Sequence, residues 1–68
     1  MFIVIELQTN ASREVATLVN SYAEQSEAES KFHQILSFAA TSELPVHGAV
    51  MLDETGMALR QEAYRHEG

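Results

Sequence analysis

Three histidines, His33, His47 and His66, are the residues of this sequence whose side chains most readily bind metals or exchange protons near neutral pH. None of them lies in a known metal-ligand spacing. Glu29 and His33 are four residues apart, so a helix would place them on one face, but such pairs are also common as surface neighbours. The sequence therefore predicts no metal site, although a dimer could bring two copies of one histidine together.

Basic residues offer a second chemistry, the capture of an anionic ligand. Lys31 and Arg60, together with His33 and His47, are the candidate lining of a pocket for a nucleotide or metal at a dimer interface. Glu27 precedes Lys31 by four residues, which is the favourable orientation for an ion pair on a helix. The spacing favours ion pairing of Lys31 over ligand capture.

Catalytic motifs are not recognisable. The serines occur without a triad pattern, and Gly48, Gly56 and Gly68 do not form a phosphate-binding loop. We therefore expect a protein that is not an enzyme and that has no cofactor and no catalytic residue.

Length and charge narrow the class of protein. A chain of 68 residues is expected to be a single domain, 1–68, and a domain of this size buries only about 60% of its unfolded surface. Without cysteine, self-association is the leading way to gain stability. The formal charge of −6 disfavours direct binding to nucleic acid. Glu6 interrupts the N-terminal apolar run, and no window approaches the roughly 20 apolar residues of a membrane span, so we expect a soluble, cytoplasmic protein.

The first half of the sequence indicates two strands and a helix. Residues 2–9 are rich in β-branched and aromatic types, and after a polar break at 9–12, where Asn10 tolerates positive φ, the alternation in 13–22 favours a second strand. A helix capped by Ser12 is the alternative for 13–22. Ser26 and Glu29 form a capping-box pattern that predicts a helix start. One apolar stripe of this helix should lie on the sheet; it consists of Ala28, Phe32, Ile35, Leu36 and Ala39.

The second half indicates another hairpin. Pro45 ends the helical region, and residues 46–52 predict a third strand with Val46, Gly48, Val50 and Leu52 on one face. Residues 53–56 have the form of a tight turn in which Gly56 takes positive φ, and 57–65 predict the fourth strand, with Ala58 and Arg60 on one face.

These elements predict an α+β fold of order ββαββ. A right-handed crossover gives a four-stranded antiparallel sheet in the order 2-1-3-4, with one helix on one face. The first strand is apolar on both sides, so a second copy should cover the face without the helix. We expect Phe2, Val4 and the outlying Phe38 at the interface of a homodimer or higher homo-oligomer.

Several segments also resemble small uncharacterised proteins encoded by phages and prophages of gut Gram-positive bacteria. They are residues 4–9 (VIELQT), 27–33 (EAESKFH), 45–47 (PVH) and 64–66 (YRH). The sequence departs from that family at its first turn, which lacks a glycine. The resemblance implies a protein in the cytoplasm of a host bacterium, and it transfers no functional residue.

Two functions follow as hypotheses. The first is a non-enzymatic homo-oligomeric binding protein that modulates a host protein, including a host defence factor. The alternative is a small-ligand binding protein with the pocket of Lys31, His33, His47 and Arg60 described above.

Overall fold

Two hairpins flank one helix in the chain. The computed structural model describes residues 1–66; Glu67 and Gly68 lie outside the described residues. Its elements are β1 (Phe2–Thr9), β2 (Val15–Tyr22), α1 (Gln25–Ala40), β3 (Val46–Asp53) and β4 (Ala58–Arg65). The predicted order ββαββ is confirmed, and so is the assignment of the second element as a strand rather than a helix.

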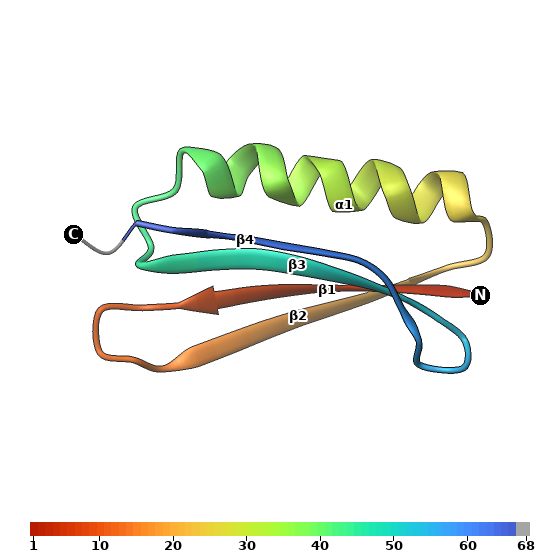
Figure 1. The fold of residues 1–68 in the computed structure, drawn as a ribbon, viewed down its shortest axis with the longest axis horizontal. Coiled ribbons are helices and arrows are strands. Elements are labelled where there is room, and N and C mark those ends of the chain that lie inside the picture. The colour runs from red at the N-terminus through yellow and green to blue at the C-terminus, as the bar shows by residue number, and fades with distance from the viewer. Residues whose placement is uncertain (67–68) are drawn as a thin grey trace.

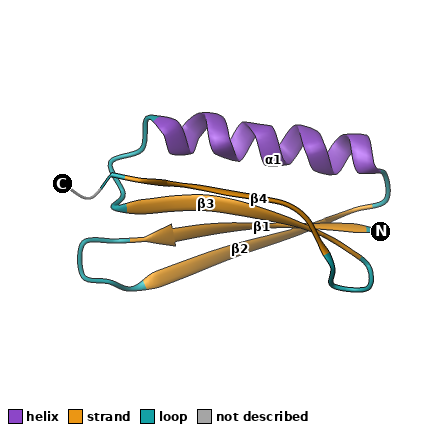
Figure 2. Ribbon diagram, in the orientation of Figure 1, coloured by secondary structure: helices purple, strands orange, loops and turns teal. Residues whose placement is uncertain are grey.

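The strands form one antiparallel sheet in the order β2-β1-β3-β4, as predicted (Figure 1). β1 and β3 occupy the middle, and β2 and β4 are the edges. Helix α1 covers one side of the sheet and leaves the other side without a layer, as Figure 2 shows. No helix in residues 1–66 has the length and apolar character needed to cross a membrane.

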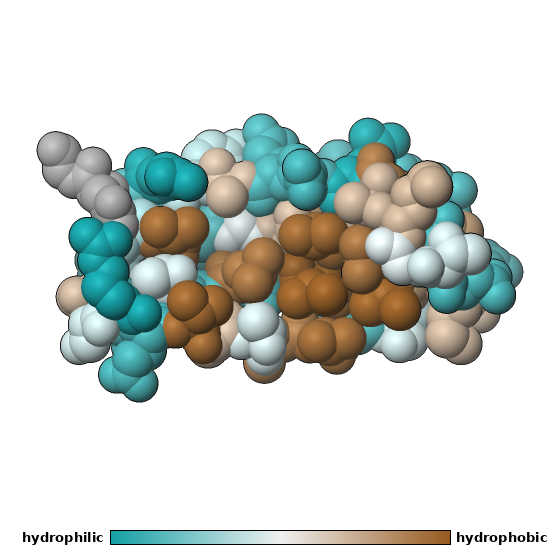
Figure 3. All heavy atoms as spheres, turned by 60° about the horizontal axis from the view of Figure 1, so that its bottom comes forward, coloured by the Kyte–Doolittle hydropathy of each residue, from teal (hydrophilic) through white to brown (hydrophobic). Residues whose placement is uncertain are grey.

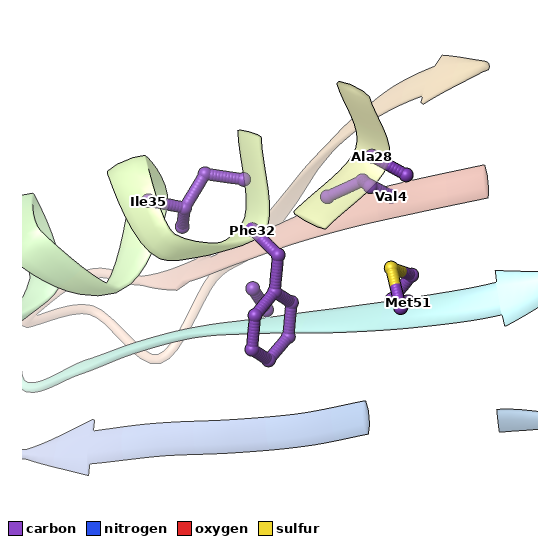
Figure 4. Close-up of a cluster of buried hydrophobic side chains, with 6 residues drawn as sticks. Val4, Ala28, Phe32, Ile35 and Met51 are labelled. Atoms are coloured by element: carbon purple, nitrogen blue, oxygen red, sulfur yellow. The ribbon is translucent and has the colours of Figure 1, made fainter. Parts of the chain in front are cut away.

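The hydrophobic core lies between α1 and the two central strands. Ala28, Phe32 and Ile35 of the helix form one cluster with Val4 of β1 and Met51 of β3, and each of these side chains is buried (Figure 4). The helical stripe predicted from the sequence is confirmed, with Ala39 also buried and Leu36 packed against the cluster. Burial of the stripe removes apolar surface from water and is the main force that holds the helix on the sheet.

The start of the helix differs from the prediction. The N-cap is Glu24, its side chain makes no capping hydrogen bond, and Ser26 lies inside the first turn. The N–H of Ala28 donates to the backbone O of Glu24 at 3.2 Å, so the helix already begins before Ser26. The capping-box prediction was wrong because the helix begins at Gln25, one residue before Ser26, and Ser26 is therefore not the N-cap.

The first turn is a three-residue hairpin loop. The N–H of Asn10 donates to the O of Glu14, and the N–H of Arg13 donates to the O of Asn10, each at 3.0 Å. The residue with positive φ is Arg13 (φ 68°), not Asn10, and for this reason β2 begins at Val15 rather than at 13. Asn10 stabilises the loop through its side-chain oxygen, which accepts hydrogen bonds from the N–H groups of Ser12 and Glu14.

The second turn confirms the role of Gly56, whose φ is 91°. Asp53 accepts hydrogen bonds from the hydroxyl and N–H of Thr55 and from the N–H of Met57, and these bonds lower the pKa of Asp53. A register irregularity follows in the sheet, because Met51 pairs with Arg60 but Leu52 pairs with Ala58. Ala58 and Arg60 therefore project to opposite faces, which corrects the prediction that they share one.

Candidate functional site: the open face of the sheet

The side of the sheet opposite α1 presents apolar residues from all four strands. The register assigns to this open face Ile3, Ile5, Leu7 and Thr9 of β1, Val15, Thr17, Val19 and Ser21 of β2, Val46, Gly48, Val50 and Leu52 of β3, and Ala58, Gln61, Ala63 and Arg65 of β4. Figure 3 shows apolar residues gathered along the middle of the molecule, with hydrophilic residues at both ends and along the upper margin.

Charge is almost excluded from this face. Among its residues, as given above, Arg65 alone is charged, and no carboxylate occurs there although the chain has ten acidic residues. Val15 and Val19 at one edge are 62% and 60% exposed. An antiparallel sheet that faces water normally alternates apolar residues with polar ones, so this face does not have the composition of a solvated surface.

A shallow hollow lies on the open face where small residues meet. Gly48 lacks a side chain, and its neighbour across the β3–β4 ladder is Ala63. Together with Leu7, Val50 and Gln61 they line a hollow of about 350 Å³. A Cβ at position 48 would lie only 2.6 Å from the Cβ of Ala63, so the close approach of β3 and β4 requires glycine there. The hollow has room for an apolar side chain from another molecule.

The opposite side of the sheet holds a buried acid–base pair under the helix. Nε2 of His47 lies 2.6 Å from Oε2 of Glu6, and the side chains are only 6% and 15% exposed. Gln8 donates a second hydrogen bond to the same Glu6 oxygen at 2.9 Å. Because a carboxylate only accepts, Nε2 of His47 is the donor.

The environment of Glu6 favours its charged form. Burial alone would raise the pKa of Glu6, but the hydrogen bonds from Gln8 and His47 and the positive charges of His47 and Lys31 outweigh it and lower the pKa below its ordinary value of 4.5. Nδ1 of His47 is buried without a hydrogen-bond partner. The pair links β1 to β3, with little of either side chain exposed.

Of the four predicted ligand-binding residues, His47 and Lys31 both act on Glu6, whereas Arg60 and His33 have other partners. His47 is bonded to Glu6, and Nε of Arg60 donates to Oε1 of Glu29 at 2.7 Å. His33 is exposed on α1, where its ring meets that of Phe32 edge to face. Lys31 contributes positive charge toward Glu6. These contacts do not gather the four side chains around one pocket.

In the fold, Glu29 forms an ion pair with Arg60, a residue far from it in the sequence. Glu29 is engaged by Arg60 of β4, so its carboxylate links the helix to the sheet edge. Within residues 1–66, no three side chains of the metal-binding types gather as a possible cation site.

The interface prediction needs correction for the first strand. Val4 is fully buried beneath α1, and Phe2 packs against the same core, so both lie on the covered side. Because side chains alternate along a strand, the residues of β1 on the open face are Ile3, Ile5 and Leu7. Phe38 is 63% exposed on α1, as expected for a residue outside the buried stripe.

No family model, curated protein or solved structure matches the chain. The resemblance to phage-encoded proteins therefore stays a prediction.

Sequence reasoning missed the pair of Glu6 and His47, which are 41 positions apart. The pairing of Gln8 with His47 in the sheet register places Glu6 diagonally opposite His47, within reach of a long side chain. An acid and a base on the first and third strands were the available signal, but it required the register to be known.

Proposed function

We propose that this protein is a non-enzymatic binding protein that works as a homo-oligomer, in which a second copy covers the open face of the sheet. The single observation that carries the proposal is the composition of that face, which combines apolar residues from all four strands with one charged side chain, Arg65. Because the chain has a formal charge of −6, the repulsion between two copies is weakest where they meet through a surface without carboxylates.

The size of the face supports this arrangement. Four strands of eight residues, at about 3.3 Å per residue and about 4.8 Å between strands, span roughly 500 Å² in plan. The accessible area is larger because side chains project from the plan. The largest apolar patch of a monomer covers about 300–600 Å², and each partner of a stable interface buries about 800 Å². In plan, the open face therefore equals the largest apolar patches of monomers, and its projecting side chains bring its accessible area closer to that of a dimer interface.

The shape of the face favours stacking of two sheets. Sheets that pack face to face lie about 10 Å apart, with interdigitating side chains. The hollow at Gly48 and Ala63 accepts a side chain of the second copy, while Leu7 and Val50 beside it project outward. A two-fold arrangement lets each copy supply both the projecting side chain and the hollow.

The role that we propose for the oligomer is stoichiometric capture of a host protein, as the resemblance to phage-encoded proteins implies. Phe38, exposed on the outer surface of α1, remains available for a target after the open faces have stacked. The small-ligand alternative has less support, because Arg60 is paired with Glu29 and His47 with Glu6.

The test is the molar mass in solution of the wild type and of Ile5→Lys, measured by size-exclusion chromatography with light scattering. Ile5 lies at the centre of the open face, so a lysine there would place an unpaired charge in the stacked interface. We expect the wild type to show at least twice the monomer mass of 7.6 kDa, and Ile5→Lys to lose the stacked contact.

Ser37→Lys, on the exposed surface of α1, is the matched control and should keep the wild-type mass. A wild type that stays monomeric at about 100 µM, a concentration at which interfaces with micromolar affinity are occupied, would overturn the proposal.

A further inference from the structure

The two edges of the sheet are protected very differently against pairing with another strand. β4 carries Arg60, Glu62 and Arg65, and its pairing with β3 is irregular near Leu52. Charged side chains and bulges are the devices by which natural sheets keep an exposed edge from adding a strand. The β4 edge is therefore closed to strand addition.

β2 has none of these devices. Its sequence, VATLVNSY, contains no charged residue and no proline, and its pairing with β1 is regular over the whole strand. The strand is also long for an edge, with eight residues. In a chain where 21% of the residues are charged, an uncharged edge of this length is an open template for another strand.

The first turn defines which backbone groups of β2 point outward. Asn10 and Glu14 are a hydrogen-bonded pair in the ladder. Bonded and non-bonded pairs alternate in an antiparallel ladder, so Ala16 and Leu18 bond to β1, while the N–H and C=O groups of Thr17 and Val19 point away from the sheet. The outer row of β2 thus offers donors and acceptors at every second residue.

Side chains on β2 indicate what kind of strand would fit. Leu18 is 52% exposed on the helix side, although α1 covers the centre of that side, and Val15 and Val19 are exposed on the other. A strand from a different protein could not be recognised here through ionic contacts, because β2 has no charged side chain. Two copies of β2 are complementary, because an antiparallel pair centred on Leu18 sets Leu18 against itself and Thr17 against the second copy's Val19.

We propose that β2 pairs with β2 of a second copy, antiparallel about a two-fold axis at Leu18, to form a continuous eight-stranded sheet. This goes beyond the stacking of open faces proposed above, because it joins two sheets side by side. Both α1 helices lie on one side of the joined sheet, and the two open faces merge into one on the other. Edge pairing and stacking together give a tetramer.

The absence of cysteine makes a cross-linking test clean. Outward bonds at Thr17 and Val19 make Leu18 and its copy a non-hydrogen-bonded pair, with Cα atoms about 4.5 Å apart, and a disulfide needs about 4.4–6.8 Å. Under mild oxidation, the single variant Leu18→Cys should become a covalent dimer on a non-reducing gel.

The matched control is Glu62→Cys, on the same side of the sheet but at the β4 edge. This substitution also removes one of the charges that protect the β4 edge from strand addition. If Glu62→Cys still fails to cross-link, the comparison with Leu18→Cys is stringent. We expect at least tenfold more covalent dimer for Leu18→Cys than for Glu62→Cys. Equal yields for the two variants would overturn the proposal.

A second substitution, added to the Leu18→Cys variant, distinguishes the edge pairing of β2 from the stacking of the open faces. Thr17→Pro removes one outward N–H and leaves the β1 ladder intact, so cross-linking should fall at least tenfold while circular dichroism shows a folded chain. If this proline variant unfolds, Val19→Lys, which places a charge on the edge, replaces it.

Ile5→Lys in the same background should keep the cross-link even if it abolishes stacking. That result would show edge pairing without face stacking. The opposite result, face stacking without the cross-link, is distinguished by the same measurements. Loss of the cross-link in Ile5→Lys together with its survival in Thr17→Pro would assign the contact to the open face and overturn the edge proposal.

Discussion

The two faces of the sheet reverse the usual relation between burial and polarity. The covered face places Val4 and Met51 against Phe32, yet it also holds Glu6 and His47 as a buried pair. The open face lacks any carboxylate and presents apolar side chains from every strand. The more uniformly apolar face is thus the one that the helix does not cover.

This difference between the faces is the basis of our proposal that a second copy covers the open face. A buried acid–base pair is tolerable when each charge has its partner, as Glu6 and His47 do. Apolar side chains on an exposed face cannot be compensated by a neighbour in this way, because only contact with another apolar surface removes them from water. On the covered face the helix supplies an apolar surface within the same chain, whereas we propose that a second copy supplies one for the open face.

The largest loss of unfolding free energy is expected when a core side chain is truncated, and this change compares the covered face with the open face most directly. Phe32→Ala removes a buried ring from the covered face and should cost about 3–5 kcal/mol of unfolding free energy. Leu52→Ala, on the open face, is the matched change. Urea denaturation at two protein concentrations distinguishes them, since the loss for Leu52→Ala should depend on concentration as expected for an interface residue.

A loss of unfolding free energy that is independent of protein concentration for both variants would contradict this difference between the faces. It would mean that Leu52, like Phe32, acts only within one chain.

Filling the hollow should have the next largest effect. Gly48→Ala sets a Cβ 2.6 Å from the Cβ of Ala63 and should cost about 1–3 kcal/mol of unfolding free energy. Adding Ala63→Gly should restore only part of the loss, because the backbone O of Glu62 would still lie 2.7 Å from the new Cβ. Chemical denaturation of the single and double variants measures both effects; full recovery in the double variant would contradict a backbone contribution.

The buried pair should make the stability of the covered face depend on pH. The pKa of Glu6 in the folded chain lies below its ordinary value of 4.5, so its stabilising contribution is fully present above about pH 4.5 and is lost as the pH falls through the folded pKa. Glu6→Gln should lower the unfolding free energy by about 1–3 kcal/mol near neutral pH.

The difference between wild type and Glu6→Gln should shrink on acidification, because protonation neutralises Glu6 in the wild type as well. Denaturation of both proteins between about pH 7 and pH 3 isolates this term from the other carboxylates. A constant difference over that range would show that Glu6 acts by packing rather than by charge.

The smallest effect is expected from the ion pair at the margin of the covered face. Arg60 and Glu29 are 51% and 30% exposed, so Glu29→Gln should cost less than about 1 kcal/mol, and the cost should fall at high salt. Glu27→Gln, two residues away on α1, is the matched control. A larger loss than that of Phe32→Ala would mean that charge, not apolar burial, holds the helix.

Much of the fold was predictable because its signals are local or periodic. The apolar stripe of Phe32 and Ile35 repeats with the helical period, and the alternation in β2 distinguished a strand from a helix. Gly56 marked a turn that needs positive φ. The strand order followed from the hand of the crossover connection.

The orientation of β1 was not predictable. Phe2 and Val4 on one side and Ile3 and Ile5 on the other are equally apolar, so periodicity does not say which side receives the helix. Polarity was misleading as well, because Glu6 accompanies Val4 to the covered side and is neutralised there by His47. That neutralising contact arises only when β1 and β3 are paired in register.

By itself, the sequence determined the kind and order of the elements, because these depend on local periodicity and on turn residues. Only the tertiary structure decided which face is open and which edge is unprotected. Those properties depend on how residues far apart in the chain pair across strands, as Glu6 does with His47 and Gly48 with Ala63, and a one-residue change of register would exchange the two faces.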